Sequence, residues 1–127
     1  MVHKKEEFSV KLYNIMFSPT GGTQKAAELL THALGGEAAT IDLADSQYPF
    51  SAVQLTQEDV AVIAVPSYGG RVPAVAVDRL TALNGQGARA VLLCVYGNRA
   101  YEDTLVELED AAVSYTHLRA HETRHDL

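Results

Sequence analysis

The chain has 127 residues, enough for one domain, because a second hydrophobic core does not fit into this length. Its 47% hydrophobic and 20% charged residues are typical of a soluble globular protein and argue against disorder. Ten basic residues against 16 acidic ones give a net charge of −6. That sign repels phosphate backbones and anionic membrane surfaces, so we expect neither nucleic acid nor a membrane as a partner.

The sequence has no recognisable targeting segment. No run approaches the roughly 20 apolar residues of a membrane span, and the opening MVHKKEEF lacks the apolar segment of a signal peptide. We therefore expect a cytoplasmic protein. The single cysteine, Cys94, lies in the apolar run 90–96 and is predicted to be a buried core residue.

Residues 113–127, VSYTHLRAHETRHDL, differ abruptly in character from the rest of the chain. They resemble one reading frame of the adapter that transposase-based sequencing libraries attach to DNA, so we expect a foreign tail after an informative domain at 1–112. His117, His121 and His125 have the spacing of one helical face and imitate a metal site. No metal is expected, because a foreign segment carries no groups selected to orient such ligands.

The first part of the chain reads as a strand, a helix and a second strand. Residues 8–17 mix β-branched and aromatic side chains and end at a turn-rich segment, 18–23. From Thr23 the apolar residues recur at helical spacing until Gly35, and residues 38–43 form a short strand. The residues predicted to make one apolar helix face are Ala26, Ala27, Leu29, Leu30, Ala33 and Leu34.

The second part repeats the pattern twice, after an irregular crossover at 44–57. Residues 59–66 form a near-continuous apolar run, which is typical of a strand covered on both faces. Another buried strand is predicted at 90–96 and an amphipathic helix at 101–112. The intervening helix follows Pro73 and is expected to direct Ala74, Val77, Leu80 and Leu83 toward the sheet.

Alternating strands and helices predict a doubly wound parallel sheet with right-handed crossovers. In such sheets ligands bind outside the carboxyl ends of the strands, where the strand order reverses. Three loops leave carboxyl ends here, at 18–23, 67–72 and 97–100, and all are rich in glycine, hydroxyl or amide residues. These loops are the candidate site.

The first loop is suited to a phosphate monoester. Ser18, Thr20 and Thr23 offer hydroxyls, and Gly21 and Gly22 let the backbone turn its N–H groups inward at a helix start. The loop has neither the lysine of a P-loop nor the G-x-G-x-x-G pattern of a dinucleotide fold. The alternative is a helix cap with turn glycines.

The run Ser18-Pro19-Thr20-Gly21-Gly22-Thr23 resembles the phosphate loop of flavodoxins, Ser/Thr-x-Thr-Gly-x-Thr after the first strand, with Gly22 in place of the usual Asn. The resemblance spans roughly residues 10–112. It implies a flavodoxin-like α/β fold of strand order 2-1-3-4-5 that binds flavin mononucleotide (FMN), with this loop around the phosphate.

The family pattern also implies that the domain is incomplete, ending before strand 5 and its helix. Residues 90–96 would then form an unpaired edge, a template for intermolecular pairing. We expect the tail to be unable to cover this edge, and the chain to be marginally stable and aggregation-prone.

The two remaining loops resemble the segments that flank the isoalloxazine ring in this family. In the second loop the implied residues are Ser67, Tyr68, Gly69 and Gly70; in flavodoxins a peptide here reorients when the flavin is half reduced, which either glycine would permit. In the third loop they are Tyr96, Gly97, Asn98 and Tyr101. The alternatives are that Tyr68 packs a tight turn, that Tyr101 is a core residue, and that Arg71 and Arg99 are surface charges.

The resemblance implies an FMN-binding electron-transfer domain, either an electron carrier or the flavin part of an FMN-dependent oxidoreductase. Its runs VPSYGGRVP and VYGNRAYED look closest to flavodoxin-like proteins of anaerobic bacteria, some of which carry a ferredoxin module. The implied partner is thus a redox protein or an iron–sulfur module. The alternative function is a non-redox module that binds another phosphate-bearing ligand.

Overall fold

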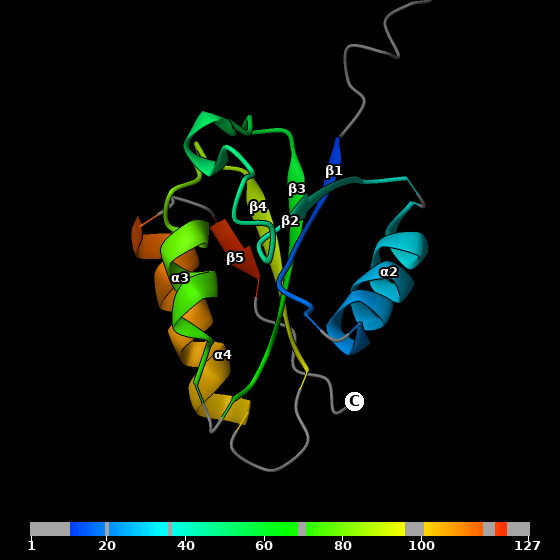
Figure 1. The fold of residues 1–127 in the computed structure, drawn as a ribbon. Helices are drawn as coiled ribbons and strands as arrows, with labels where there is room; N and C mark the ends of the chain where they lie inside the picture. The colour runs from blue at the N-terminus through cyan, green and yellow to red at the C-terminus, as the bar shows by residue number, and fades with distance from the viewer. Residues whose placement is uncertain are drawn as a thin grey trace, which may run out of the picture.

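The computed structural model describes residues 11–19, 21–35, 37–68, 71–95, 101–115 and 119–121. One parallel sheet runs through them in the order β2-β1-β3-β4-β5 (Figure 1). The strands are β1 at Leu12–Met16, β2 at Ala39–Asp42, β3 at Val60–Pro66, β4 at Arg89–Val95 and β5 at Arg119–His121.

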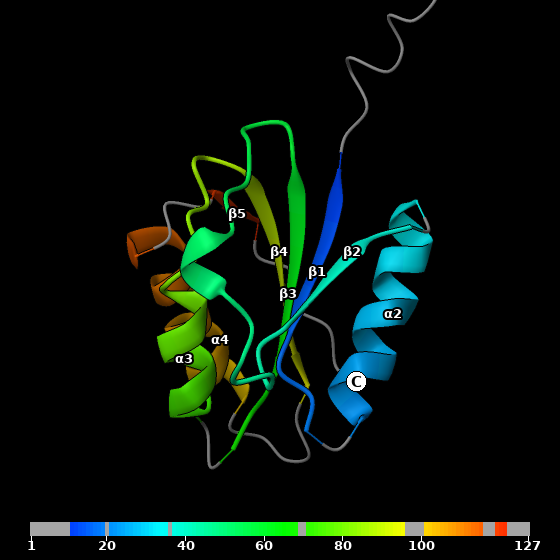
Figure 2. The same ribbon diagram turned by 45° about the horizontal axis from the view of Figure 1, so that its top comes forward.

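Helices cover both faces of the sheet (Figures 1 and 2). Helix α2, Gly22–Leu34, lies on one face, while α3, Ala74–Leu80, and α4, Tyr101–Asp110, lie on the other. The crossover predicted as irregular holds a 3₁₀ turn at Phe50–Ala52, and α4 runs on into a π-helical turn at Ala111–Tyr115. The arrangement confirms the predicted flavodoxin-like α/β architecture.

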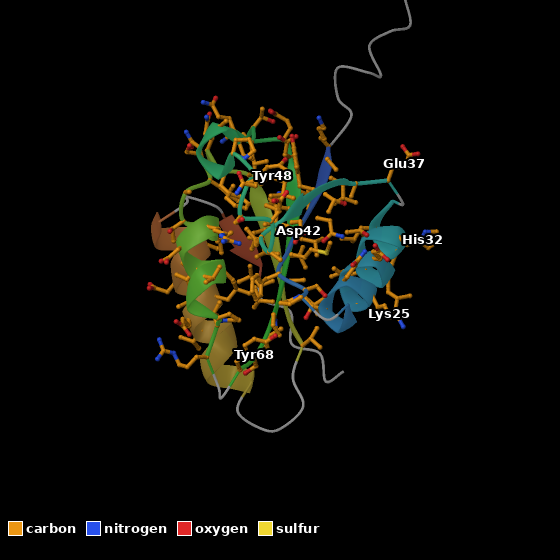
Figure 3. All side chains as sticks on the ribbon, viewed as in Figure 1. Lys25, His32, Glu37, Asp42, Tyr48 and Tyr68 are labelled. Carbon is orange, nitrogen blue, oxygen red and sulfur yellow. The ribbon has the colours of Figure 1, made fainter. Side chains whose placement is uncertain are left out.

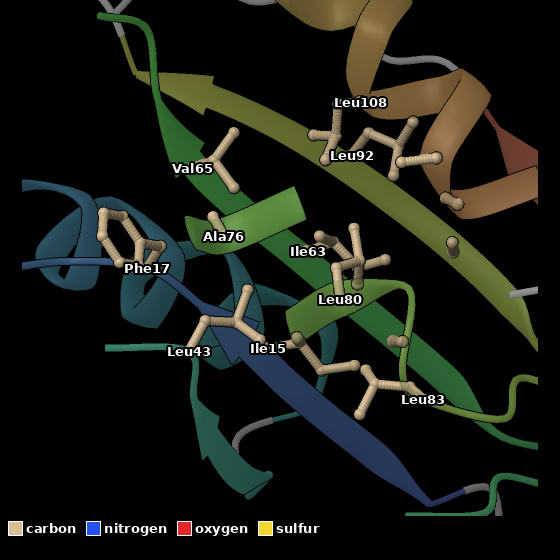
Figure 4. Packing of buried hydrophobic residues seen from close by; sticks show 14 of the residues in the cluster. Ile15, Phe17, Leu43, Ile63, Val65, Ala76, Leu80, Leu83, Leu92 and Leu108 are labelled. Atoms are coloured by element: carbon tan, nitrogen blue, oxygen red, sulfur yellow. The ribbon is translucent and has the colours of Figure 1, made fainter. Parts of the chain in front are cut away.

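The main core lies between the sheet and helices α3 and α4 (Figure 4). Ile15, Ile63 and Leu92 occupy the same level of β1, β3 and β4, because Ile15 pairs with Ile63 and Ile63 with Leu92. Leu80 and Leu108 pack onto this row from the helices, and all five side chains are at most 1% exposed. The continuous apolar runs thus build a strand layer covered on both sides.

The sequence expectation for α3 is correct at its end and wrong at its start. Leu80 is buried as predicted, and Leu83, just beyond the helix, is buried too. Ala74 is exposed, whereas Ala76 is 1% exposed. Pro73 still has an extended backbone, so the helix begins only at Ala74. With this start, Ala76 and Leu80 lie one turn apart on the side that packs on the sheet, and Ala74 does not.

The core between the sheet and α2 contains fewer buried apolar residues and more polar ones. The helix buries Thr23, Ala27 and Thr31, which recur every four residues and so form one stripe. Beneath it on β1, Asn14 is 3% exposed, and no donor within the described ranges reaches its Oδ1 atom. The predicted wide apolar face is therefore wrong for three of its residues: Leu29 (74% exposed), Leu34 (49% exposed) and the exposed Ala33.

The edge next to β4 differs from the expectation. Residues Arg119–His121 pair in parallel with Arg89–Val91, so part of the tail does act as a strand. A three-residue strand needs only backbone hydrogen bonds, and its apolar content therefore did not forecast it. His121 lies in this strand and not on a helix, while the other two tail histidines lie outside the described residues.

Cys94 on β4 is a free thiol that is 5% exposed, which confirms its predicted place in the core. Burial raises the pKa of this thiol to about 11. Within the described ranges, no helix combines the length and apolar character required to cross a membrane.

Candidate functional site

The candidate site lies at the carboxyl ends of β1 and β3, where the strand order reverses. Strand β1 stands between β2 and β3. Its following loop leads to α2 on one face, whereas the loop after β3 leads to α3 on the opposite face (Figure 1). Figure 3 shows Tyr68 at this edge of the sheet, just beyond the end of β3. Ligands of doubly wound sheets bind at such a reversal.

Hydrogen bonds hold the loop after β1 against β3 at its start and against α2 at its end. The Phe17 N–H donates to the Ala64 carbonyl at 3.0 Å, which holds the end of β1 against β3. The Ser18 Oγ accepts from the N–H of Gln24 at 2.8 Å, the third residue of α2. The residue before the helix, Gly21, has φ 96°, a left-handed conformation that disfavours any side chain.

Open space and free donors remain at the start of α2. A Cβ atom added at Gly21 or at Gly22 would meet nothing within 4 Å. Among the described residues, the N–H groups of Gly22 and Thr23 have no acceptor, as the first turn of a helix dictates. These amides and the helix dipole favour an anion, while the Thr23 side chain is only 5% exposed.

The loop after β3 forms a tight turn. The Ser67 N–H donates to the Val95 carbonyl at 2.9 Å, which extends the pairing with β4. Tyr68 and Arg71 exchange two backbone hydrogen bonds, from the Tyr68 N–H at 2.9 Å and from the Arg71 N–H at 3.0 Å. Tyr68 is 51% exposed, so the aromatic ring is available to a planar ligand.

A carboxylate on α4 holds this turn from the side. Glu107 Oε1 accepts from Arg71 Nε and Oε2 from the terminal Arg71 nitrogen, both at 2.9 Å. Oε1 also accepts from the Val72 N–H at 2.9 Å. The hydrogen bond from Arg71 lowers the pKa of Glu107 below its usual value; partial burial opposes this shift and the Val72 N–H adds to it.

Next to this ion pair is a groove of about 430 Å³ between the turn, the start of α3 and α4. Tyr68, Arg71, Asp78 and Glu107 contribute to its wall. The sequence reasoning missed Glu107, because the residue lies 36 positions from Arg71 and has no motif around it. Only the packing of α4 beside the turn identifies it.

The structure brings part of the predicted set together. Ser18, Pro19 and residues 21–23 follow β1, and Ser67 and Tyr68 follow the adjacent β3, so both groups lie at one edge of the sheet. Tyr101 is the first residue of α4, and its side chain is not described. The remaining predicted residues lie outside the described ranges: Thr20, Gly69, Gly70, Tyr96, Gly97 and Asn98, as does Arg99.

Three solved structures that align with this chain are named as flavoproteins or as a flavodoxin. A candidate flavoprotein from Bacteroides eggerthii DSM 20697 aligns with TM-score 0.67 and 21% identity, over 91% of this chain and 87% of its own. A flavoprotein in complex with FMN from Lactobacillus acidophilus NCFM gives TM-score 0.61 and 13% identity, over 90% and 91%. The Streptococcus pneumoniae TIGR4 flavodoxin gives 0.60 and 21%, over 91% and 85%.

No protein-family model matches the sequence, and no curated protein matches it either. Identities of 13–21% to the three solved structures carry an argument about architecture alone. Their TM-scores agree with the strand order and with the helices on both faces. The chain has a flavodoxin-like α/β fold.

Proposed function

We propose that the chain binds FMN at the edge formed by the loops after β1 and β3, and that it transfers electrons to a redox partner protein or an iron–sulfur module. The observation that carries this proposal is a pair of features at the reversal of strand order. The open amides of Gly22 and Thr23 lie at one loop, and the exposed Tyr68 ring lies at the other. The FMN complex of similar fold supports it.

The loop after β1 fits a phosphate group. Two N–H donors, the positive end of α2 and empty space beside both glycines provide binding without a cationic side chain. The Ser18 hydroxyl accepts from Gln24, so this residue shapes the loop. We assign the phosphate contacts to the backbone and to the hydroxyls of Thr20 and Thr23.

The turn after β3 fits a planar ring. Tyr68 offers an exposed aromatic face, and Gly69 with Gly70 allow a ring edge to approach the backbone. When bound, FMN would supply the electron-accepting ring. The residues of this chain hold the phosphate and orient the ring.

The test compares FMN with riboflavin, which lacks the phosphate. Thr20→Ala and Thr23→Val each remove one hydroxyl, and Thr23→Val keeps a similar shape at this buried position. Loss of a hydrogen bond to a charged group costs about 1.5 to 3 kcal/mol, so we expect FMN binding to weaken roughly ten- to a hundredfold. Riboflavin binding should stay within about twofold of the wild-type value, because the hydroxyls act on the phosphate alone. Equal losses for both ligands would contradict the assignment.

A second candidate function follows from the same loop. The phosphate cradle depends on α2 and not on Tyr68, so another phosphate-bearing ligand fits it equally well in a non-redox module. Absorbance and fluorescence separate the two functions. Yellow protein with quenched flavin fluorescence after FMN addition supports the flavin reading, and protection of the α2 amides by inorganic phosphate without any flavin binding supports the alternative.

A further inference from the structure

Three hydrogen bonds of the candidate ring site converge on one carboxylate. Glu107 receives two from the guanidinium of Arg71 and one from the backbone N–H of Val72, all at 2.9 Å. The fork-to-fork geometry of the Arg71 pair fixes direction as well as distance. One side chain of α4 therefore contacts both the side chain and the backbone on the carboxyl side of the turn.

The same turn is anchored on its other side by the sheet. The Ser67 N–H bonds to the Val95 carbonyl, and Tyr68 and Arg71 bond to each other across the turn. Val72 is 4% exposed and belongs to the main core, so the packing of its side chain holds its backbone in place. Tyr68 and Arg71 thus lie between two anchors, the end of β4 and Glu107.

The hydrogen bond from Val72 adds to the stabilisation that Glu107 gives the turn through its ion pair with Arg71. Arg71 is 73% exposed, and exposed ion pairs are screened by water and contribute little. Glu107 is only 26% exposed, and its bond to the Val72 N–H satisfies a donor beside the core. Loss of the carboxylate removes three bonds at once, whereas loss of Arg71 leaves the backbone bond in place.

We propose that Glu107 is a positioning residue for the ring site: through Arg71 and Val72 it fixes the turn that presents Tyr68 to the flavin. This role rests on the proposed function. Glu107 bonds to Arg71 and Val72 of the turn, and the proposal assigns it no contact of its own with the ring. Its loss should therefore affect FMN and riboflavin alike, unlike the loss of a phosphate contact.

The first measurement is amide hydrogen exchange in the flavin-free chain. In Glu107→Ala we expect the Tyr68, Arg71 and Val72 amides to exchange at least about tenfold faster, because the anchor on one side of the turn is gone. The Ile63 amide in β3 serves as an internal reference, since global destabilisation accelerates it as well. Glu109→Gln removes the same charge from the same helix and should leave all these rates unchanged.

The second measurement is the affinity for FMN and for riboflavin. Glu107→Ala should weaken both by the same factor, on the order of tenfold, which corresponds to one broken charge-assisted hydrogen bond. Glu107→Gln keeps an acceptor for the Val72 N–H and should lie between Glu107→Ala and wild type. It also covers the case in which Glu107→Ala does not fold.

The outcomes separate the positioning role of Glu107 from the proposed binding of FMN. Selective exchange at the turn together with equal flavin losses supports the positioning role. Unchanged exchange, or a loosened turn with wild-type riboflavin affinity, overturns it while FMN binding stands. A wild-type chain that binds neither flavin overturns the proposed function and the flavin role of Glu107 with it.

Discussion

The two loops of the candidate site are held in opposite ways. The loop after β1 is fixed by neighbours in sequence, with Ser18 bonded to Gln24 and Gly21 to Lys25. The turn after β3 has local backbone bonds between Tyr68 and Arg71, but it is held in place by Glu107, 36 residues away from Arg71 on another helix. The first loop is therefore part of a helix start, while the second depends on the docking of α4. The candidate site therefore combines a loop whose bonds join residues close in sequence with a turn whose anchor forms only when the chain folds.

The largest effect should come from the conformation of Gly21. Gly21→Val forces a β-branched residue into φ 96°, and left-handed backbone costs an L-residue at least roughly 1–2 kcal/mol. Thermal or urea unfolding should show this loss of stability. FMN binding should fall as well, because the strained residue displaces the amides that follow it.

Gly22→Ala is the matched control for this substitution. Gly22 has no positive φ and nothing lies within 4 Å of an added Cβ, so apo stability should stay equal or rise by about 0.4–1 kcal/mol. FMN affinity should nevertheless fall, because the methyl group enters the space assigned to the phosphate. Unchanged FMN affinity of the Gly22→Ala variant would show that the phosphate does not bind at this helix start.

Ser18→Ala should give the next largest effect. The substitution removes the acceptor of the Gln24 N–H, and loss of a helix-capping side chain costs about 1 kcal/mol. We expect a lower unfolding free energy in the flavin-free chain, with the exchange rates at Tyr68 and Arg71 unaltered. Faster exchange at both loops would show that they form one cooperative unit, and the distinction between a local and a long-range half would fail.

The same distinction explains what the sequence predicts well. The continuous apolar run of β3 and the Gly-rich start of α2 are local patterns, and each led to the correct element. The prediction that Leu29 faces the sheet is wrong, because the stripe that packs on the sheet consists of Thr23, Ala27 and Thr31. Which side of the helix packs on the sheet depends on the sheet surface beneath it. Strand β5 is too short to produce any pattern.

Glu107 illustrates the limit most clearly. It lies in an amphipathic helix that the sequence does predict, yet nothing near it in the chain specifies Arg71 and Val72 as its partners. Such a contact is fixed by the packing of α3 and α4 on one face of the sheet. The adapter-like origin of residues 113–127 likewise rests on resemblance alone and stays a prediction, which the genomic sequence of the parent gene tests.

The smallest effect should appear on acidification, and it should involve only the turn. The pKa of Glu107 is lowered in the folded chain, so its bonds stabilise the turn at neutral pH and are lost as the pH falls below the ordinary glutamate range, about 4.3. No residue from Ser18 to Gln24 titrates, so the loop after β1 should not respond.

Riboflavin is the appropriate probe of this pH effect, because the phosphate of FMN titrates itself. We expect riboflavin affinity to fall in the acid range for wild type and to change less for Glu107→Gln, which carries no ionisable group at this position. Asp78 borders the same groove, and it is present in both chains. The difference between their pH profiles therefore isolates Glu107. Identical profiles would mean that the carboxylate has no influence on the ring site.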